Sequence, residues 1–194
     1  MRASRKSIYL PGDSFPDDEY VRRTLEHRLG ITLELIEDRK PEEPPARLHR
    51  LRRYFEAFPD VTFTLFGRSS GCRVVTQMAT DPEFAPRIES VVALSYPFHR
   101  PCWPDQPERY AHLHQVRSRC LIIQGRTDPY NGDREVTAYG LSNTTTVHHV
   151  PCDHNMWLEP PLWDLLGATI GAFVGDRVLA DLRRGGPALP RLCA

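Results

Sequence analysis

Short apolar segments rich in β-branched residues alternate with amphipathic segments along most of the chain. Such segments have the length, branching and bounding turns of β-strands. Six of them are predicted, at residues 7–10, 31–36, 61–66, 91–96, 120–124 and 145–150. Between them, apolar side chains recur with helical spacing, as at Val21, Leu25 and Leu29. The hydrophobic pattern therefore predicts strands and helices in alternation.

The amphipathic segments carry start signals of helices. Asp17 and Asp18 can cap the first helix, and the second opens at Pro44 and Pro45 before apolar residues at 48, 51, 55 and 58. A helical pattern also starts at Cys72 and includes Val74, Val75 and Met78, shortly after the third strand. The last helix opens at Pro160 and Pro161, runs towards Leu182 and ends at residues 185–187.

Strands that alternate with helices of ten or more residues imply crossover connections and a mostly parallel sheet covered on both faces. We therefore predict a single three-layer, doubly wound α/β domain over residues 1–184, with about six strands and a flexible C-terminal tail at 185–194. The connection at residues 97–117 is long and rich in Pro, His and aromatic residues. Connections of that length are often functional, for example as lids.

The charge balance, the apolar runs and the cysteine spacing argue against several classes of function. The 194 residues carry 25 Lys plus Arg against 25 Asp plus Glu, so no overall field favours nucleic acid or an anionic membrane. No apolar run is long enough for a signal peptide or a membrane span. The five cysteines show no C-x-x-C pair, and a cytoplasmic location is expected. A Cys102–Cys152 disulfide is the disfavoured alternative to free thiols.

The end of the third strand carries the strongest chemical signal. Residues 67–71 read Gly-Arg-Ser-Ser-Gly, and a helical pattern follows at once. A G-x-S-x-G sequence between a strand and a helix is typical of a sharp turn that lifts the serine hydroxyl above the sheet. The glycines are needed because a side chain there would strike the neighbouring strand and helix. Ser69 is therefore the candidate nucleophile.

A serine needs a base and an orienting acid, and the next strands end in suitable residues. Asp128 follows the fifth strand, and His154 follows the sixth. Because the carboxyl ends of parallel strands form one edge of the sheet, these residues are expected beside Ser69. Asp153 is a rival acid, but its adjacency to His154 makes it hard for its carboxylate to reach the imidazole. Asp128 is the preferred acid.

These residues, with the segments 93–99, 112–113 and 121–125, resemble the α/β-hydrolase superfamily over nearly the whole chain. Within it, the chain resembles small cap-less members, near dienelactone-hydrolase-like and testis-expressed-type predicted hydrolases. The resemblance implies a minimal α/β-hydrolase fold, with Ser69 as nucleophile, His154 as general base and Asp128 as orienting acid. Dienelactone hydrolase itself uses Cys where this chain has Ser69.

The resemblance also carries expectations about the sheet and the oxyanion hole. Residues 7–10 match the family's third strand, so two leading strands would be missing and the first strand would lie near the centre of six parallel strands. The backbone N–H groups of Ser70 and Asp13 are the candidate oxyanion donors. Most relatives have a His-Gly pair in the loop that carries Asp13, and an inward-facing Asp13 carboxylate would repel the oxyanion.

Some further residues could rim the catalytic edge. A substrate pocket is suggested by Arg68, Phe98, Arg100, Trp103, Tyr110 and Trp157. No metal site or cofactor is expected, because His148 and His149 point to opposite faces of a strand and no carboxylate-rich motif accompanies them. The arginines at 47, 50, 52 and 53 are interpreted as a solvated helix face rather than a nucleic-acid site.

The sequence thus predicts a serine esterase or thioesterase that acts on a small-molecule ester or thioester through an acyl-enzyme. Two alternatives stay open. One is a lyase, cyclase or acyltransferase that uses the same three residues. The other is a catalytically silent hydrolase-fold protein that binds a ligand or partner, an alternative suggested by Asp13. The substrate and the oligomeric state cannot be derived from the sequence.

Overall fold

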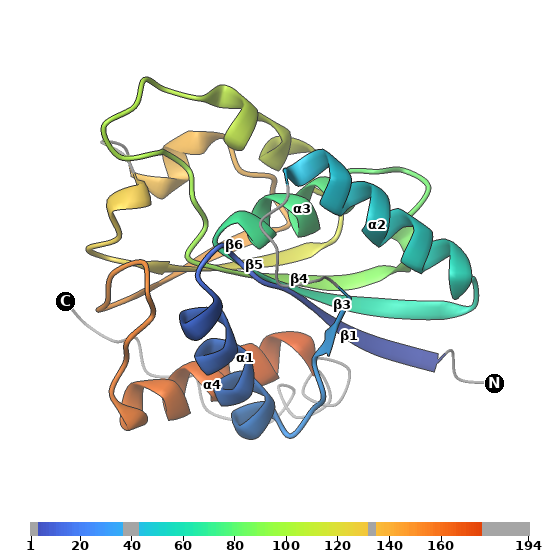
Figure 1. Cartoon of the computed structure of the whole chain (residues 1–194), viewed down its shortest axis with the longest axis horizontal. Coiled ribbons are helices and arrows are strands. Elements are labelled where there is room, and N and C mark those ends of the chain that lie inside the picture. Colours follow the sequence, from blue (N-terminus) through green and yellow to red (C-terminus); the bar gives the residue numbers. More distant parts are fainter. Residues whose placement is uncertain (1–3, 37–42, 132–134, 176–194) are drawn as a thin grey trace.

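One sheet of six parallel strands runs through the molecule in the order β2-β1-β3-β4-β5-β6 (Figure 1). The computed structural model describes residues 4–36, 43–131 and 135–175. The strands are β1 (Ser4–Leu10), β2 (Glu34–Leu35), β3 (Val61–Arg68), β4 (Ile88–Leu94), β5 (Arg119–Gly125) and β6 (Thr145–Val150). All six predicted strands are present, and every pairing between them is parallel, so the predicted α/β architecture is confirmed.

Helices cover both faces of the sheet. Helices α1 (Phe15–Leu29) and α4 (Pro160–Val174) lie below it in Figure 1, and α2 (Pro44–Ala57) and α3 (Ser70–Met78) lie above it. Five short 3-10 helices complete the described elements, at Ala85–Arg87, Pro107–Arg109, Ala111–Gln115, Pro129–Asn131 and Val136–Tyr139. The doubly wound, three-layer arrangement is the one the sequence predicts.

Side-chain alternation along the central strands divides the core in two. Leu65 of β3 packs with Leu51 and Phe55 of α2, whereas its neighbour Phe66 packs with Val21 and Leu25 of α1. Successive residues of a strand point to opposite faces of the sheet, so a strand buried on both faces needs apolar residues at odd and even positions alike. This explains why β3, β4 and β5 appear in the sequence as continuous apolar runs.

Several strand boundaries differ from the prediction, and two of the differences have a clear cause. Strand β2 has two residues rather than six, because the N–H of Leu33 is used by the Glu26 carboxylate at 2.9 Å instead of a neighbouring strand. Strand β4 ends at Leu94, before the predicted Tyr96, because Ser95 has a positive φ of 54° and the N–H of Tyr96 donates to Gln124 Oε1 at 2.8 Å. Side-chain acceptors thus end both strands.

The position of the first strand also differs from expectation. Strand β1 lies next to the edge, with only β2 outside it, rather than near the centre. The reason is that β3, β4, β5 and β6 are all added on its other side. The centre of the sheet is consequently formed by β3 and β4, and β3 is the strand that ends at the Ser69 turn.

The long connection at residues 97–117 is fixed to the core near both ends. Phe98 and Leu113 are fully buried in the layer that contains α2 and α3. Arg109 Nε donates to the carbonyl of Pro97 at 2.9 Å, and Tyr96 Oη donates to the carbonyl of Arg109 at 2.6 Å. Residues 100–105 are mostly exposed. The connection is therefore a packed segment with an exposed tip rather than a freely hinged lid.

Further expectations concern the last helix and the cysteines. Helix α4 starts at Pro160 as predicted and is described to Val174, whereas its expected continuation to Leu182 and the tail at 185–194 lie outside the described residues. Cys102 and Cys152 are free thiols. Among the described helices, none has the length and apolar character that a membrane crossing requires.

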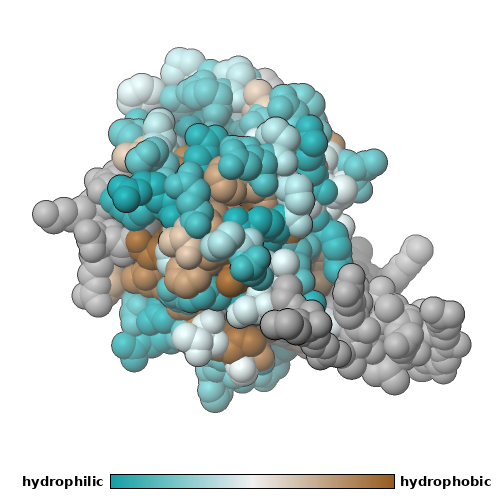
Figure 2. Space-filling model, turned by 90° about the vertical axis from the view of Figure 1, so that its right-hand side faces the viewer, coloured by the Kyte–Doolittle hydropathy of each residue, from teal (hydrophilic) through white to brown (hydrophobic). Residues whose placement is uncertain are grey.

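One side of the molecule is mostly hydrophilic (Figure 2). Figure 2 shows the side of the molecule that lies to the right in Figure 1, and hydrophobic residues appear there as small areas between hydrophilic ones. Lys6 and Glu34 form an ion pair across β1 and β2 at 2.8 Å. A charged pair at a sheet edge opposes the addition of a further strand from another chain.

Candidate active site

Ser69 occupies a strained turn between β3 and α3. Its backbone has φ 47° and ψ −122°, a region that residues with a side chain rarely adopt. A Cβ at Gly67 would lie 2.8 Å from the backbone of Cys72, and one at Gly71 would lie 2.2 Å from the carbonyl oxygen of Leu10. Both glycines are therefore required by close backbone approach, as the sequence predicts. The turn leaves Ser69 partly exposed above the sheet.

A chain of hydrogen bonds links Ser69, His154 and Asp128. His154 Nε2 lies 2.8 Å from Ser69 Oγ, and His154 Nδ1 lies 2.9 Å from Asp128 Oδ2. When Nδ1 carries the proton and donates to the carboxylate, Nε2 can accept the hydrogen bond from the serine hydroxyl. The structure therefore brings together the three residues that the sequence predicts at successive strand ends.

Asp128 is buried and fully engaged, with 3% of its surface exposed. Its Oδ2 also accepts from Gln124 Nε2 at 2.9 Å, and its Oδ1 accepts the N–H of Tyr130 at 2.8 Å. The rival acid, Asp153, instead accepts the N–H of Asn155 at 2.9 Å and is exposed. Of the two carboxylates, only that of Asp128 bonds to the imidazole.

The loops that carry the acid and the base are joined by hydrogen bonds. The N–H of Arg126 donates to the carbonyl of Val150 at 2.9 Å, and Thr127 donates to the carbonyl of Cys152 through both its N–H and its hydroxyl, at 3.2 and 3.0 Å. The ring of Tyr130 packs against the His154 imidazole with centroids 4.2 Å apart. These contacts hold the His154 loop beside the Asp128 loop and support the imidazole.

The two expected oxyanion donors lie beside Ser69. In the described part of the chain, the N–H groups of Ser70 and Asp13 have no hydrogen-bond acceptor. The exposed Asp13 carboxylate accepts from Ser70 Oγ at 2.9 Å, and Arg47 Nη1 donates to the same Oγ at 3.0 Å. The carboxylate is thus held by the Ser70 side chain, with the positive charge of Arg47 on the other side of that hydroxyl.

Two of the residues expected to rim a pocket are instead buried. Arg68 is 1% exposed, because its guanidinium pairs with Asp18 at 3.1 Å on the face of the sheet that α1 covers. Phe98 is fully buried and stacks on Tyr139 with centroids 4.6 Å apart. Neither side chain offers surface to a substrate. The prediction that Arg68 and Phe98 rim a substrate pocket is therefore corrected, and the acid that Arg68 binds is the protein's own Asp18.

The other four expected pocket residues are at least partly accessible. Arg100 lies over the ring of Trp103 at 4.2 Å in the exposed tip of the 97–117 connection. Tyr110 packs edge-on against Tyr139, and its hydroxyl donates to Asp105 Oδ2 at 2.8 Å. Trp157 is 63% exposed and stacks on Tyr20 of α1, with centroids 5.1 Å apart. Their role in a pocket stays a prediction.

Sequence reasoning missed Gln124, Tyr130 and Arg47. Gln124 is a polar residue at the end of an apolar strand. Because such a residue usually has a buried hydrogen-bond partner, its position in the sequence could have indicated a polar contact at this strand end. Tyr130 lies two residues after Asp128. Arg47 was interpreted as part of a solvated face, but it is buried, and its Nη2 donates to the carbonyl of Pro11 at 2.5 Å. Helical periodicity gave no sign of this contact.

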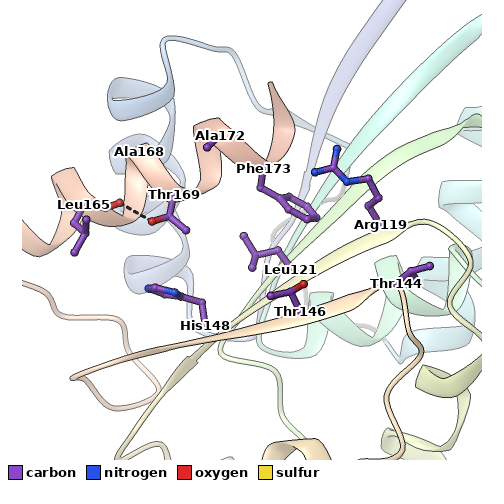
Figure 3. Close-up of a pocket in the computed structure, with 10 residues that line it drawn as sticks. All are labelled: Arg119, Leu121, Thr144, Thr146, His148, Leu165, Ala168, Thr169, Ala172 and Phe173. Carbon is purple, nitrogen blue, oxygen red and sulfur yellow. Dashed lines mark hydrogen bonds between the residues drawn. The ribbon is translucent and has the colours of Figure 1, made fainter. Parts of the chain in front are cut away.

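A separate cavity of about 480 Å³ lies between α4 and the edge strand β6 (Figure 3). Its walls include Phe173 of α4, Leu121 of β5 and His148 of β6, with Arg119 at one end. Arg119 and Thr146 lie near the amino ends of their strands, whereas Ser69, Asp128 and His154 follow the carboxyl ends. The cavity is lined by none of the three candidate active-site residues and is separate from the candidate active site. Within the described residues, no group of three or more His, Cys, Asp or Glu side chains is arranged to hold a metal ion.

Solved structures with a similar fold include several lipolytic enzymes. A monoacylglycerol lipase from Paleococcus ferrophilus superimposes with a TM-score of 0.65 at 12% identity, over 89% of this chain and 93% of that one. A structure from work on the metagenome-derived lipolytic enzymes LipS and LipT gives 0.62 at 15% identity, over 90% and 95%. The esterase domain of a Rhodothermus marinus protein gives 0.60 at 14% identity, over 89% and 87%. At these identities, the likeness establishes the fold.

Sequence comparison gives a more direct assignment. A search of curated proteins found no significant match. A family model described as an alpha/beta hydrolase domain, however, matches residues 33–160, which is about two thirds of the chain. The matched region contains the Ser69 turn, Asp128 and His154, and the parallel sheet agrees with it. The chain therefore belongs to the α/β-hydrolase family.

Proposed function

We propose that the chain is a serine hydrolase that cleaves a small-molecule ester or thioester through an acyl-enzyme. The observation that carries the proposal is the hydrogen-bonded series from Ser69 Oγ through His154 to Asp128, with Ser69 in a strained strand-to-helix turn. A serine hydroxyl is a weak nucleophile on its own, and a neighbouring imidazole with an orienting carboxylate activates it.

In the first half-reaction, Ser69 Oγ attacks the carbonyl carbon while its proton passes to His154 Nε2. Asp128 holds the imidazole in the required tautomer and stabilises the imidazolium that forms. Collapse of the tetrahedral intermediate breaks the bond to the leaving alcohol or thiol, which takes the proton from Nε2. The acyl group then remains on Ser69 as an ester.

In the second half-reaction, water replaces the leaving group. His154 Nε2 removes a proton from the water as its oxygen attacks the acyl carbon, and then returns the proton to Ser69 Oγ. The products are a carboxylic acid and the free enzyme. Both tetrahedral intermediates carry a negative oxygen, for which the unused N–H groups of Ser70 and Asp13 are the proposed donors.

The test compares covalent labelling with turnover. A fluorophosphonate probe should label the wild-type protein and fail to label Ser69→Ala or His154→Ala, and p-nitrophenyl acetate should be hydrolysed by the wild type only. Ser90→Ala is the matched control, because Ser90 Oγ is buried with no hydrogen-bond partner among the described residues. It should be labelled as the wild type is.

Other outcomes separate the competing functions. Equal ester hydrolysis by the wild type and Ser69→Ala would exclude Ser69 as the nucleophile. A protein that takes up no probe under any condition would instead fit a hydrolase-fold binding protein. Labelling of Ser69 without release of a carboxylic acid in water would favour transfer to another acceptor over hydrolysis.

A further inference from the structure

Arg68, the residue before the proposed nucleophile, turns its side chain towards α1. Arg68 has the same strand parity as Phe66, which packs towards α1, so its side chain also enters the layer between the sheet and α1. Only 1% of Arg68 is exposed, and its partner Asp18 on α1 is 3% exposed. A guanidinium and a carboxylate thus lie buried directly beneath the Ser69 turn.

This buried pair touches two other loops of the site. Arg68 Nη1 donates to Asp18 Oδ1 at 3.1 Å, and Arg68 Nη2 donates to the backbone carbonyl of His154 at 3.3 Å. Asp18 Oδ1 also accepts the N–H of Gly12 at 2.8 Å, in the loop that carries the Asp13 N–H. The pair therefore connects the nucleophile turn, the base loop and the oxyanion loop.

Such a pair is a poor way to stabilise a fold. Asp18 Oδ2 and Arg68 Nε have no hydrogen-bond partner among the described residues, so the pair is incompletely satisfied. Burial raises the pKa of Asp18 above its ordinary value, and Arg68 opposes that rise. Buried ion pairs are often replaced by apolar residues without loss of stability. A role in the site accounts better for the contacts to Gly12 and His154.

We propose that Asp18 and Arg68 act as a positioning pair, which holds the His154 and Gly12 loops against the Ser69 turn and keeps the guanidinium charge neutralised next to the base. This inference rests on the proposed hydrolase function. The Arg68 guanidinium sets the position of the His154 backbone through its hydrogen bond to the His154 carbonyl. The negative charge of Asp18 offsets the positive charge of Arg68, which would otherwise oppose formation of the His154 imidazolium.

The other ionisable groups around His154 do not reverse the direction of this effect of the Asp18 charge on imidazolium formation. Asp128 and Tyr130 face its imidazole, and Asp153 and Cys152 belong to its own loop. Near the Asp18–Arg68 pair, the Tyr9 hydroxyl donates to the Asp18 carbonyl at 3.3 Å, and the Asp17 carboxylate lies 4.0 Å from Arg68. Asp13 and Cys72 are more distant from the pair. Arg68 is the cation that bonds directly to the base loop. Loss of the Asp18 charge therefore makes protonation of His154 less favourable.

The experiment measures the pH dependence of kcat/KM for p-nitrophenyl acetate in Asp18→Asn and Asp18→Glu. Asparagine keeps an oxygen for Gly12 and removes the charge. In Asp18→Asn, we expect the acid limb of the pH profile of kcat/KM to move to lower pH by about half a unit. We also expect kcat to fall about tenfold with little change in KM. Asp18→Glu keeps the charge, so its acid limb should coincide with that of the wild type. Equal profiles for Asp18→Asn and the wild type, with kcat within twofold, would overturn the proposal, as would equal shifts in Asn and Glu variants.

Two additions keep the result interpretable. The double variant Asp18→Asn/Arg68→Met leaves no lone buried charge and should fold even where Asp18→Asn does not. It should keep the wild-type acid limb with reduced kcat, and wild-type kcat in this variant would refute the positioning role. NMR titration of the His154 imidazole, assigned with His154→Ala, needs no turnover. A lower midpoint in Asp18→Asn would support the inference even if ester hydrolysis itself were not found, and an unchanged midpoint would count against it.

Discussion

His154 Nε2 lies 2.8 Å from Ser69 Oγ, although 85 residues separate the two in the sequence. The contact exists because β3 and β6 run parallel, so the residues that follow them emerge at the same edge of the sheet. Strands β4 and β5 lie between them and fix their separation. The proposed nucleophile and base are therefore positioned by the sheet rather than by local sequence.

The orienting role of Asp128 predicts a large effect on turnover. Asp128→Asn should lower kcat for p-nitrophenyl acetate by about 10³- to 10⁴-fold, because an amide can donate to Nδ1 and favour the wrong tautomer. Asp153→Asn is the matched control and should stay within about twofold of the wild type, since the Asp153 carboxylate bonds only to the N–H of Asn155 among the described residues. Steady-state kinetics of both variants decide between the two acids. A larger loss in Asp153→Asn would reverse the assignment.

The carboxylate of Asp13 should hinder ester hydrolysis. It lies beside the proposed oxyanion donors, held by Ser70 Oγ at 2.9 Å. Asp13→Asn keeps an acceptor for that hydroxyl and removes the negative charge, so kcat should rise severalfold, by up to about tenfold. The gain should shrink in high salt because the site is exposed. A fall in kcat would mean instead that the carboxylate takes part in the reaction, for example by binding a cationic substrate.

Close packing at the Ser69 turn predicts an effect on stability. Gly71→Ala would place a Cβ 2.2 Å from the carbonyl oxygen of Leu10, so the α3 start must move and the free energy of unfolding should fall by about 3 kcal/mol or more. Gly171→Ala in α4 is the control, because within the described part of the chain its Cβ would meet only Leu29 Cδ2, at an ordinary 3.7 Å. That variant should gain up to about 1 kcal/mol from helix propensity. Urea denaturation of both variants measures the difference.

His112 predicts a pH dependence of stability. Burial, with smaller contributions from Arg73 and His114, lowers the pKa of His112 from 6.5 to about 4. Its Nε2 lies 2.8 Å from Thr76 Oγ1. The unfolded chain takes up the proton first as the pH falls below about 6.5, so stability that is present at neutral pH is lost towards pH 4. Between pH 7 and 4.5, the wild type should lose about 2 to 3 kcal/mol more than His112→Gln in urea denaturation. Equal losses would show that His112 is protonated in the folded state.

The sequence was informative where chemistry depends on strand ends. The Ser69 turn, Asp128 and His154 were each placed by a strand boundary and by the rule that parallel strands end at one edge. The hydrophobic pattern identified all six strands. It could not place β1 beside the edge of the sheet, because the order of strands depends on which side each crossover takes, and the hydrophobic pattern carries no such information.

Charged residues show where sequence reasoning fails. Arg68 is expected at the rim of a pocket and Arg47 on a solvated helix face, but each is buried against a polar partner far away in sequence. Periodicity assigns a residue to a face of a helix or strand and says nothing about the group opposite. Asp18 was expected only as a helix cap, yet its carboxylate accepts from Gly12 and Arg68. Such long-range polar contacts require coordinates.

Strand β6 is at the edge of the sheet and pairs only with β5, yet the loop that follows it carries His154. Local opening of β6 would separate the imidazole from both Ser69 and Asp128 while β1, β3 and β4 remain paired. Inactivation by heat or urea should then precede global unfolding. Amide exchange in β6 would report that first step, and the catalytic lifetime of the protein would be set by one edge strand rather than by the stability of the whole core.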